Sequence, residues 1–196
     1  MMYGFSMDEV GEIFVSMLVV AIAFSLHYLF ISKMEFIAMF PVILIGVGTG
    51  FVLHEIAHKF TAIRYGAHAR YQAWQSGLLM TLALAVLTRG AFVFAAPGAV
   101  YIYAHGMTRR MNGIISIAGP LTNLTVGIIF ALIALFLAPE NSYLMVVAYF
   151  AAQINFFLGF FNMLPIPPLD GSKVFGWNIL YWVALTVPLG LLAFFF

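Results

Sequence analysis

The chain has 196 residues, of which 64% are hydrophobic and 8% charged, and its formal net charge is +1. Because soluble domains carry about a quarter charged residues, this chain cannot cover a water-facing surface, and we expect an integral membrane protein embedded in the lipid bilayer. The sequence has no Lys/Arg-rich run of the kind that contacts phosphates, so we expect no nucleic-acid partner. The absence of cysteine excludes a disulfide framework and a cysteine zinc site.

Five charge-free stretches are long enough to cross the hydrocarbon core of a bilayer, which takes roughly 20 helical residues. They lie at residues 13–32, 36–53, 114–138, 142–161 and 174–196. The second stretch is expected to continue as a helix to about Arg64, and Pro188 predicts a kink in the last. Acidic residues precede the first stretch, where a signal peptide would be basic, so we expect no signal peptide: Asp8, Glu9 and Glu12.

Residues 77–104 form a more complex segment. Its apolar run, GLLMTLALAVL, is too short for a straight crossing, and the following residues are rich in aromatic and β-branched types. Basic residues lie on both sides of it: Lys59, Arg64 and Arg70 before, Arg109 and Arg110 after. The positive-inside rule places both groups in the cytosol. We therefore expect a re-entrant helix followed by β-structure, such as a hairpin, near the cytosolic face, with two short crossings as the alternative.

The whole chain, residues 1–196, is predicted to be a single α-helical, multi-pass membrane domain with about five to six transmembrane helices. Counting the crossings from the cytosolic basic residues places the N-terminus in the cytosol. We found no internal repeat and no low-complexity linker that would divide the chain.

The second span ends in a His-Glu-x-x-His pattern, formed by His54, Glu55 and His58. On a helix, residues four apart share a face, so both imidazoles can bind one zinc ion, and Glu55 can take a proton from a water at that ion. Backbone carbonyls can also satisfy two helix histidines, but three ionisable groups at a membrane helix favour a functional site. Three preceding glycines offer a small-residue face to another helix: Gly46, Gly48 and Gly50.

A catalytic zinc site needs a third protein ligand, and Asp170 is the favoured candidate. It lies in the proline-rich segment FNMLPIPPLDGSKVF, and the membrane topology places it on the same face as His58. An ordinary Asp-Gly turn is the alternative interpretation. The other candidates are His27 in the first span, where a packing histidine is favoured, Glu35 at the far end of the second, and His68 and His105 in polar border segments.

The motifs HEIAH and NMLPIPPLDG, with SIAGPLTN between them, resemble those of the site-2 protease family, the intramembrane zinc metalloproteases of peptidase family M50. The resemblance covers residues 36–173, the expected catalytic core, and suggests a minimal membrane-core form with peripheral helices at 13–32 and 174–196. It implies that His54, His58 and Asp170 bind one Zn²⁺ per chain and that Glu55 is the catalytic base.

The resemblance extends to supporting residues. It implies that Asn123 and Asn162 orient the site or stabilise the developing oxyanion; a helix–helix hydrogen bond is the alternative for Asn123. Close helix approach and a kink explain Gly119 and Pro120. The family also suggests a sheet edge that binds an extended substrate, and the segment GAVYIY is the candidate, with substrate contacts at Ala99, Val100, Tyr101 and Ile102.

These features predict a metalloendopeptidase that cleaves transmembrane helices of membrane-protein substrates, in the cell membrane and with its active site toward the cytosol. A membrane metal-ion transporter that uses His54, His58 and Asp170 as a transit site is the alternative from another functional class. A third hypothesis, a non-catalytic binder of membrane proteins, has less support because every expected catalytic residue is present.

Overall fold

The computed structural model describes residues 4–104 and 106–196, and most of them are helical. Within these described residues, four helical segments are long and apolar enough to cross a membrane: Met7–Ile31, Lys33–Arg64, Arg109–Leu137 and Tyr143–Asn162. They correspond to the first four predicted spans. Two shorter apolar helices accompany them, α4 (Gln75–Leu87) and α8 (Ile179–Phe195).

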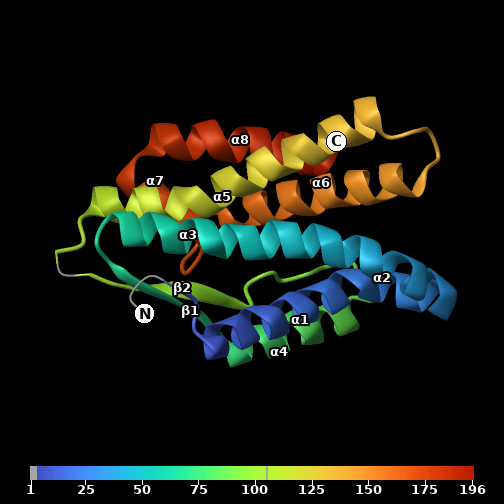
Figure 1. Ribbon diagram of the computed structural model, residues 1–196, viewed down its shortest axis with the longest axis horizontal. Helices are drawn as coiled ribbons and strands as arrows, with labels where there is room; N and C mark the ends of the chain where they lie inside the picture. Colours follow the sequence, from blue (N-terminus) through green and yellow to red (C-terminus); the bar gives the residue numbers. More distant parts are fainter. Residues whose placement is uncertain (1–3, 105) are drawn as a thin grey trace.

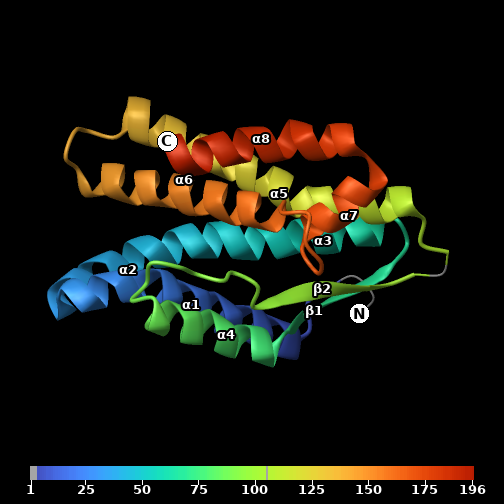
Figure 2. The same cartoon turned by 180° about the vertical axis from the view of Figure 1, so that it is seen from behind.

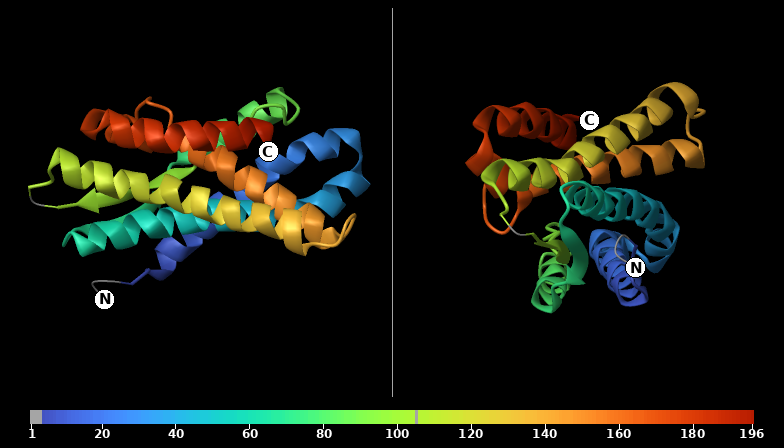
Figure 3. Two further views of the ribbon diagram at one scale, coloured as in Figure 1. Left: turned by 90° about the horizontal axis from the view of Figure 1, so that it is seen from above. Right: turned by 60° about the vertical axis from the view of Figure 1, so that its left-hand side comes forward.

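The helices pack in two groups on either side of one long helix (Figures 1 and 3). This long helix consists of α2 (Lys33–Val47), a π-helical turn (Gly48–Val52) and α3 (Leu53–Arg64). On one side lie α5 (Arg109–Leu132), α6 (Tyr143–Asn162), α7 (Asp170–Trp177) and α8. On the other side lie α1 (Met7–Ile31) and α4. The predicted continuation of the second span to Arg64 is confirmed.

A two-stranded antiparallel sheet lies beside α3, at the end of the molecule that also holds α7 (Figure 2). Strand β1 (His68–Ala73) pairs with β2 (Gly98–Tyr103), from His68 opposite Tyr103 to Ala73 opposite Gly98. The sequence predicted β-structure at residues 98–103 but not its partner β1. The strands do not form a tight hairpin, because α4 and residues 88–97 lie between them in the chain.

The last apolar stretch, predicted as one helix, forms two. It is divided at Asn178, whose backbone is extended (φ −157°, ψ 114°). The Asn178 side chain accepts a 2.9 Å hydrogen bond from the Leu180 N–H and so begins a new helix, α8. That helix runs through Pro188 without interruption. The break was missed because one capping asparagine carries little weight in an apolar stretch.

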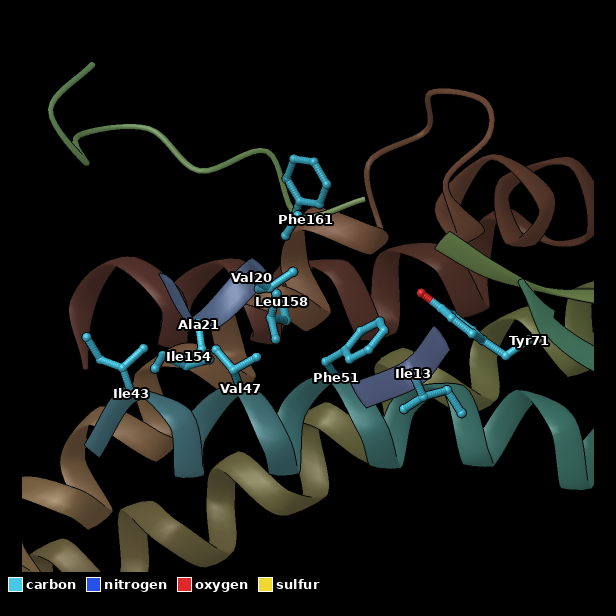
Figure 4. Packing of buried hydrophobic residues seen from close by; sticks show 11 residues of the cluster. Ile13, Val20, Ala21, Ile43, Val47, Phe51, Tyr71, Ile154, Leu158 and Phe161 are labelled. Carbon is cyan, nitrogen blue, oxygen red and sulfur yellow. The ribbon is translucent and has the colours of Figure 1, made fainter. Parts of the chain in front are cut away.

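A cluster of buried side chains joins α1, the long helix, β1 and α6 (Figure 4). Val20, Val47, Phe51 and Leu158 pack at its centre. Two of the three glycines in the predicted small-residue face allow the long helix to approach α6. A Cβ atom would lie 2.7 Å from Ile154 Cδ1 at Gly46 and 2.9 Å from Leu158 Cδ1 at Gly50, whereas Gly48 faces Met17 on α1.

Candidate metal centre

Three potential metal ligands, contributed by α3 and α7, converge in the interior. His54 Nε2 lies 2.9 Å from His58 Nε2, and Asp170 Oδ2 lies 3.3 Å and 2.8 Å from these two nitrogens. The three residues are 3%, 6% and 8% exposed. Among residues 4–104 and 106–196, this is the group of histidine and acidic side chains whose geometry could hold a metal ion.

The donor set and its surroundings suit zinc. Zinc–ligand bonds of about 2.0–2.2 Å separate tetrahedral ligand atoms by roughly 3.4 Å, so an outward shift of about half an ångström accommodates the ion. Gly119 on α5 leaves the necessary space, because a Cβ atom there would lie 2.5 Å from His58 Nε2 and 2.6 Å from His54 Nε2. The close helix approach expected at Gly119 is therefore also a contact with the candidate ligands, which the sequence alone does not indicate.

Hydrogen bonds fix the orientation of both imidazole rings. His54 Nδ1–H donates to Asn123 Oδ1 at 2.6 Å, and His58 Nδ1–H donates to the Ile115 carbonyl at 2.8 Å. Because each Nδ1 carries the proton, the Nε2 lone pairs are directed at the common point with Asp170. Asn123 therefore makes an interhelical hydrogen bond with His54, which is a candidate metal ligand.

Asp170 is the first residue of α7 and has a cationic neighbour. Its Oδ1 lies 3.2 Å from Lys173 Nζ, which leaves Oδ2 for the centre. The neighbouring ammonium favours the carboxylate form of Asp170, which is the form that binds a metal ion. Gly171 permits a close approach, because a Cβ atom there would collide with the Met163 backbone.

Glu55 lies on α3 beside these ligands, 7% exposed, and its Oε2 atom is buried without a hydrogen-bond partner. Such an orphaned oxygen in a native protein calls for an explanation, and a reacting water or substrate group provides one. Glu55 shares a cavity of about 230 Å³ with the three candidate ligands, Asn162 and β2 residues that include Val100.

The remaining predicted site residues differ in position. Asn162 lines the cavity, and its Nδ2 donates to the Leu158 carbonyl at 3.0 Å. Ala99, Val100, Tyr101 and Ile102 lie on β2 and also line it.

The alternative ligands His27 and His68 are exposed side chains on α1 and β1, and the packing role expected for His27 does not hold. Glu35 is in the first turn of α2, and His105 lies outside the described residues.

Acidic side chains of α1 bind the outer edge of β1. Glu9, 2% exposed, accepts hydrogen bonds from Lys59 Nζ (2.6 and 2.7 Å) and from the Tyr71 N–H (2.9 Å). Glu12 accepts a 2.7 Å hydrogen bond from the Ala73 N–H. Burial raises the pKa of Tyr71, with a smaller contribution from Glu55, so its hydroxyl stays neutral and contacts Ser16 Oγ at 2.9 Å.

Comparison with known proteins identifies relatives along most of the chain. Residues 138–183, which include Asn162 and Asp170, match the sequence model of Peptidase family M50. A protein of Methanocaldococcus jannaschii named as a putative zinc metalloprotease is 41% identical over 187 residues, which are 95% of this chain and 93% of that protein.

Bacterial relatives are more distant. The putative zinc metalloprotease Rip2 of Mycolicibacterium smegmatis is 33% identical over 158 residues, 72% of this chain and 58% of that protein. A protein of Bacillus subtilis with a name of the same kind, YwhC, is 28% identical over 151 residues, 70% of this chain and 69% of that protein. No solved structure matches the chain significantly.

Proposed function

The chain belongs to peptidase family M50, and on this premise we propose that it is an intramembrane zinc endopeptidase that cleaves membrane-spanning segments of other proteins. The observation that carries the proposal is the convergence of His54 Nε2, His58 Nε2 and Asp170 Oδ2 beside the orphaned Oε2 of Glu55. Membership in a peptidase family favours proteolysis over metal transport, for which no contact in the site gives specific support.

Each side chain has a proposed role in peptide hydrolysis. Bound zinc supplies Lewis-acid chemistry, because it lowers the pKa of water and polarises a carbonyl group. His54, His58 and Asp170 hold the ion, and Glu55 accepts the proton of the attacking water and passes it to the departing amine. Asn123 keeps His54 in its ligand tautomer. Asn162, which lines the same cavity, is proposed to orient the substrate or donate to its developing oxyanion.

The outer edge of β2 is the proposed binding site for an unwound substrate. Tyr71 pairs with Val100, and the Tyr71 N–H is directed to Glu9, away from β2. In an antiparallel pair, the opposite residue then also directs its N–H and C=O away from its partner strand. The backbone groups of Val100 and, two residues on, Ile102 thus face outward. The Val100 N–H bonds the Glu55 carboxylate, so the N–H of Ile102 is the one available to an added strand, and both residues line the cavity.

A proposed membrane placement follows from the same helices. His54 precedes Arg64, at the helix end, by ten residues, so it lies about 15 Å from that end. With the basic end of α3 in the cytosol, the centre lies near the cytosolic side of the hydrocarbon core of the cell membrane. We propose α8 as a fifth crossing and α4 with residues 88–97 as the re-entrant segment. One domain then spans the chain, with its catalytic core at 36–173.

The decisive experiment compares the full chain with its Glu55→Gln variant in detergent. Zinc content is measured, and each protein is incubated with a membrane-spanning peptide. Both proteins should bind close to one zinc per chain, and the variant should cleave roughly 10²- to 10⁴-fold more slowly, because it lacks the general base. Glu35→Gln makes the same chemical change at the exposed end of the long helix and should keep full activity. Equal cleavage by wild type and Glu55→Gln would refute the role of Glu55.

A further inference from the structure

Asn155 on α6 is a buried amide outside the predicted site. It is fully inaccessible and lies in a mostly apolar helix. Burying an amide costs free energy unless its hydrogen bonds are satisfied. Asn155 Nδ2 donates to the Ala151 carbonyl at 2.8 Å and to Thr49 Oγ1 at 3.2 Å, while its Oδ1 accepts from Asn123 Nδ2 at 3.3 Å. These contacts tie Asn155 to the residue that binds His54.

The hydrogen bonds have a defined direction. Thr49 Oγ1 donates its own proton to the Ile45 carbonyl at 2.9 Å, so it acts as an acceptor toward Asn155. The amide nitrogen of Asn155 must therefore face Thr49 and Ala151, which leaves its oxygen facing Asn123. The carbonyls of Ile45 and Ala151 therefore set the orientation of the Asn155 amide, the first through Thr49 and the second directly.

The orientation of Asn123 follows from its two acceptors. Its Nδ2 donates to the Gly50 carbonyl at 2.8 Å as well as to Asn155 Oδ1. If the amide were flipped, its oxygen would face these two acceptors and its nitrogen would face His54 Nδ1. Gly50 lies in the π-helical turn immediately before α3, and such turns occur frequently at functional sites because they alter the regular backbone hydrogen bonds.

We propose that Asn155 is a positioning residue for the metal centre. It fixes the Asn123 amide with its oxygen toward His54, and Asn123 in turn keeps the proton on His54 Nδ1 and the Nε2 lone pair toward the metal. This inference rests on the zinc centre proposed above but not on proteolysis. Its test is zinc affinity, which can be measured whether or not the protein cleaves a peptide.

The experiment is a double-mutant cycle on the full chain in detergent, with zinc affinity measured by competition against a chromophoric chelator. Removing a direct partner of a metal ligand lowers affinity about 10- to 100-fold, so Asn123→Leu should lie in that range. Asn155→Leu acts one contact further away, and we expect a decrease of roughly three- to tenfold. In the Asn123→Leu background, Asn155→Leu should cause no further decrease, because the residue through which it acts is gone.

Two further variants make the test decisive. Gln153→Leu exchanges another amide of α6, one whose buried Oε1 has no hydrogen-bond partner, and should leave zinc affinity unchanged. If Asn155→Leu does not fold, Asn155→Ser replaces it, since a serine can bond the carbonyl four residues earlier but cannot reach Asn123. Unchanged affinity in the Asn155 variant, or an equal decrease with and without Asn123, would overturn the proposal. Loss of peptide cleavage without loss of zinc affinity would contradict it as well.

Discussion

Replacing Gly119 by alanine should remove zinc binding while leaving the helical fold intact. The added Cβ atom would lie 2.5 Å from His58 Nε2 and 2.6 Å from His54 Nε2. Non-bonded heavy atoms prefer separations of roughly 3.5 Å, so the imidazoles would have to move by about 1 Å. Metal sites tolerate deviations of about 0.2 Å in ligand distance. We therefore expect zinc affinity to fall by a factor of about 100 or more.

The diagnostic effect on stability is the loss of the zinc-dependent gain. At a zinc concentration 100 times Kd, binding stabilises the wild type by about 2.7 kcal/mol, and a 100-fold weaker site gains only about 0.4 kcal/mol. For a chain of this size, the wild-type gain corresponds to a rise in Tm of roughly 5–10 °C. Without zinc, Gly119→Ala should unfold at or somewhat below the wild-type temperature, because displacing the buried imidazoles costs about 1–3 kcal/mol and the preference of alanine for a helix offsets only about 1 kcal/mol of this.

The assay records thermal unfolding of the full chain in detergent, with chelator and with added zinc. Gly176→Ala is the control for a helical glycine with open space around it, and it should show the wild-type response to zinc. Gly127→Ala is the control for a clash elsewhere on α5, because its Cβ atom would collide with Phe156. It should lower both unfolding temperatures and keep the difference between them. A wild-type zinc response in Gly119→Ala would refute the assigned position of the metal.

Two further predictions concern Glu9, which binds β1, and the outer edge of β2. Glu9→Gln leaves the buried Lys59 ammonium without its carboxylate, so the free energy of unfolding measured with denaturant should fall by about 3–5 kcal/mol. Glu35→Gln is the exposed control and should unfold like the wild type. Wild-type stability of Glu9→Gln would contradict the role of the ion pair. Ile102→Pro removes one outward N–H from β2, so kcat/KM for a membrane-spanning peptide should fall roughly three- to tenfold at unchanged zinc content. Tyr101→Pro, at a position bonded to β1, should disrupt the sheet, and unchanged cleavage by Ile102→Pro would exclude this edge as the substrate site.

The parts of the site that could be predicted from sequence are those with local spacing or a recognisable motif. His54 and His58 are four residues apart on a helix, so their shared face follows from helical geometry alone. Asp170 is distant in sequence, but its proline-rich surroundings and the family motif identified it as a candidate. The continuous helix to Arg64 was equally predictable, because its apolar run leads directly into the histidine pattern.

The supporting contacts could not be predicted because they depend on how helices pack. Asn155 precedes Asn162 by seven residues on α6, yet only the approach of α5 reveals that Asn155 contacts Asn123. The role of Gly119 is visible only when the imidazoles of another helix lie against it. Strand β1 carries Arg70 and Gln72 among apolar residues, and its pairing with β2 across an intervening helix leaves no local signal.

The acidic residues before the first apolar stretch have a structural role that the sequence alone does not indicate. Glu9 and Glu12 are three residues apart and share a face of α1, and their carboxylates bind the outward N–H groups of Tyr71 and Ala73. A two-stranded sheet has two edges that could accept an added strand, and α1 occupies the edge belonging to β1. The edge of β2, which borders the cavity, is the one we propose for an incoming chain. Because Lys59 follows His58 directly, its ion pair with Glu9 also fixes this helix to the backbone of the metal centre, so α1 and the site should loosen together.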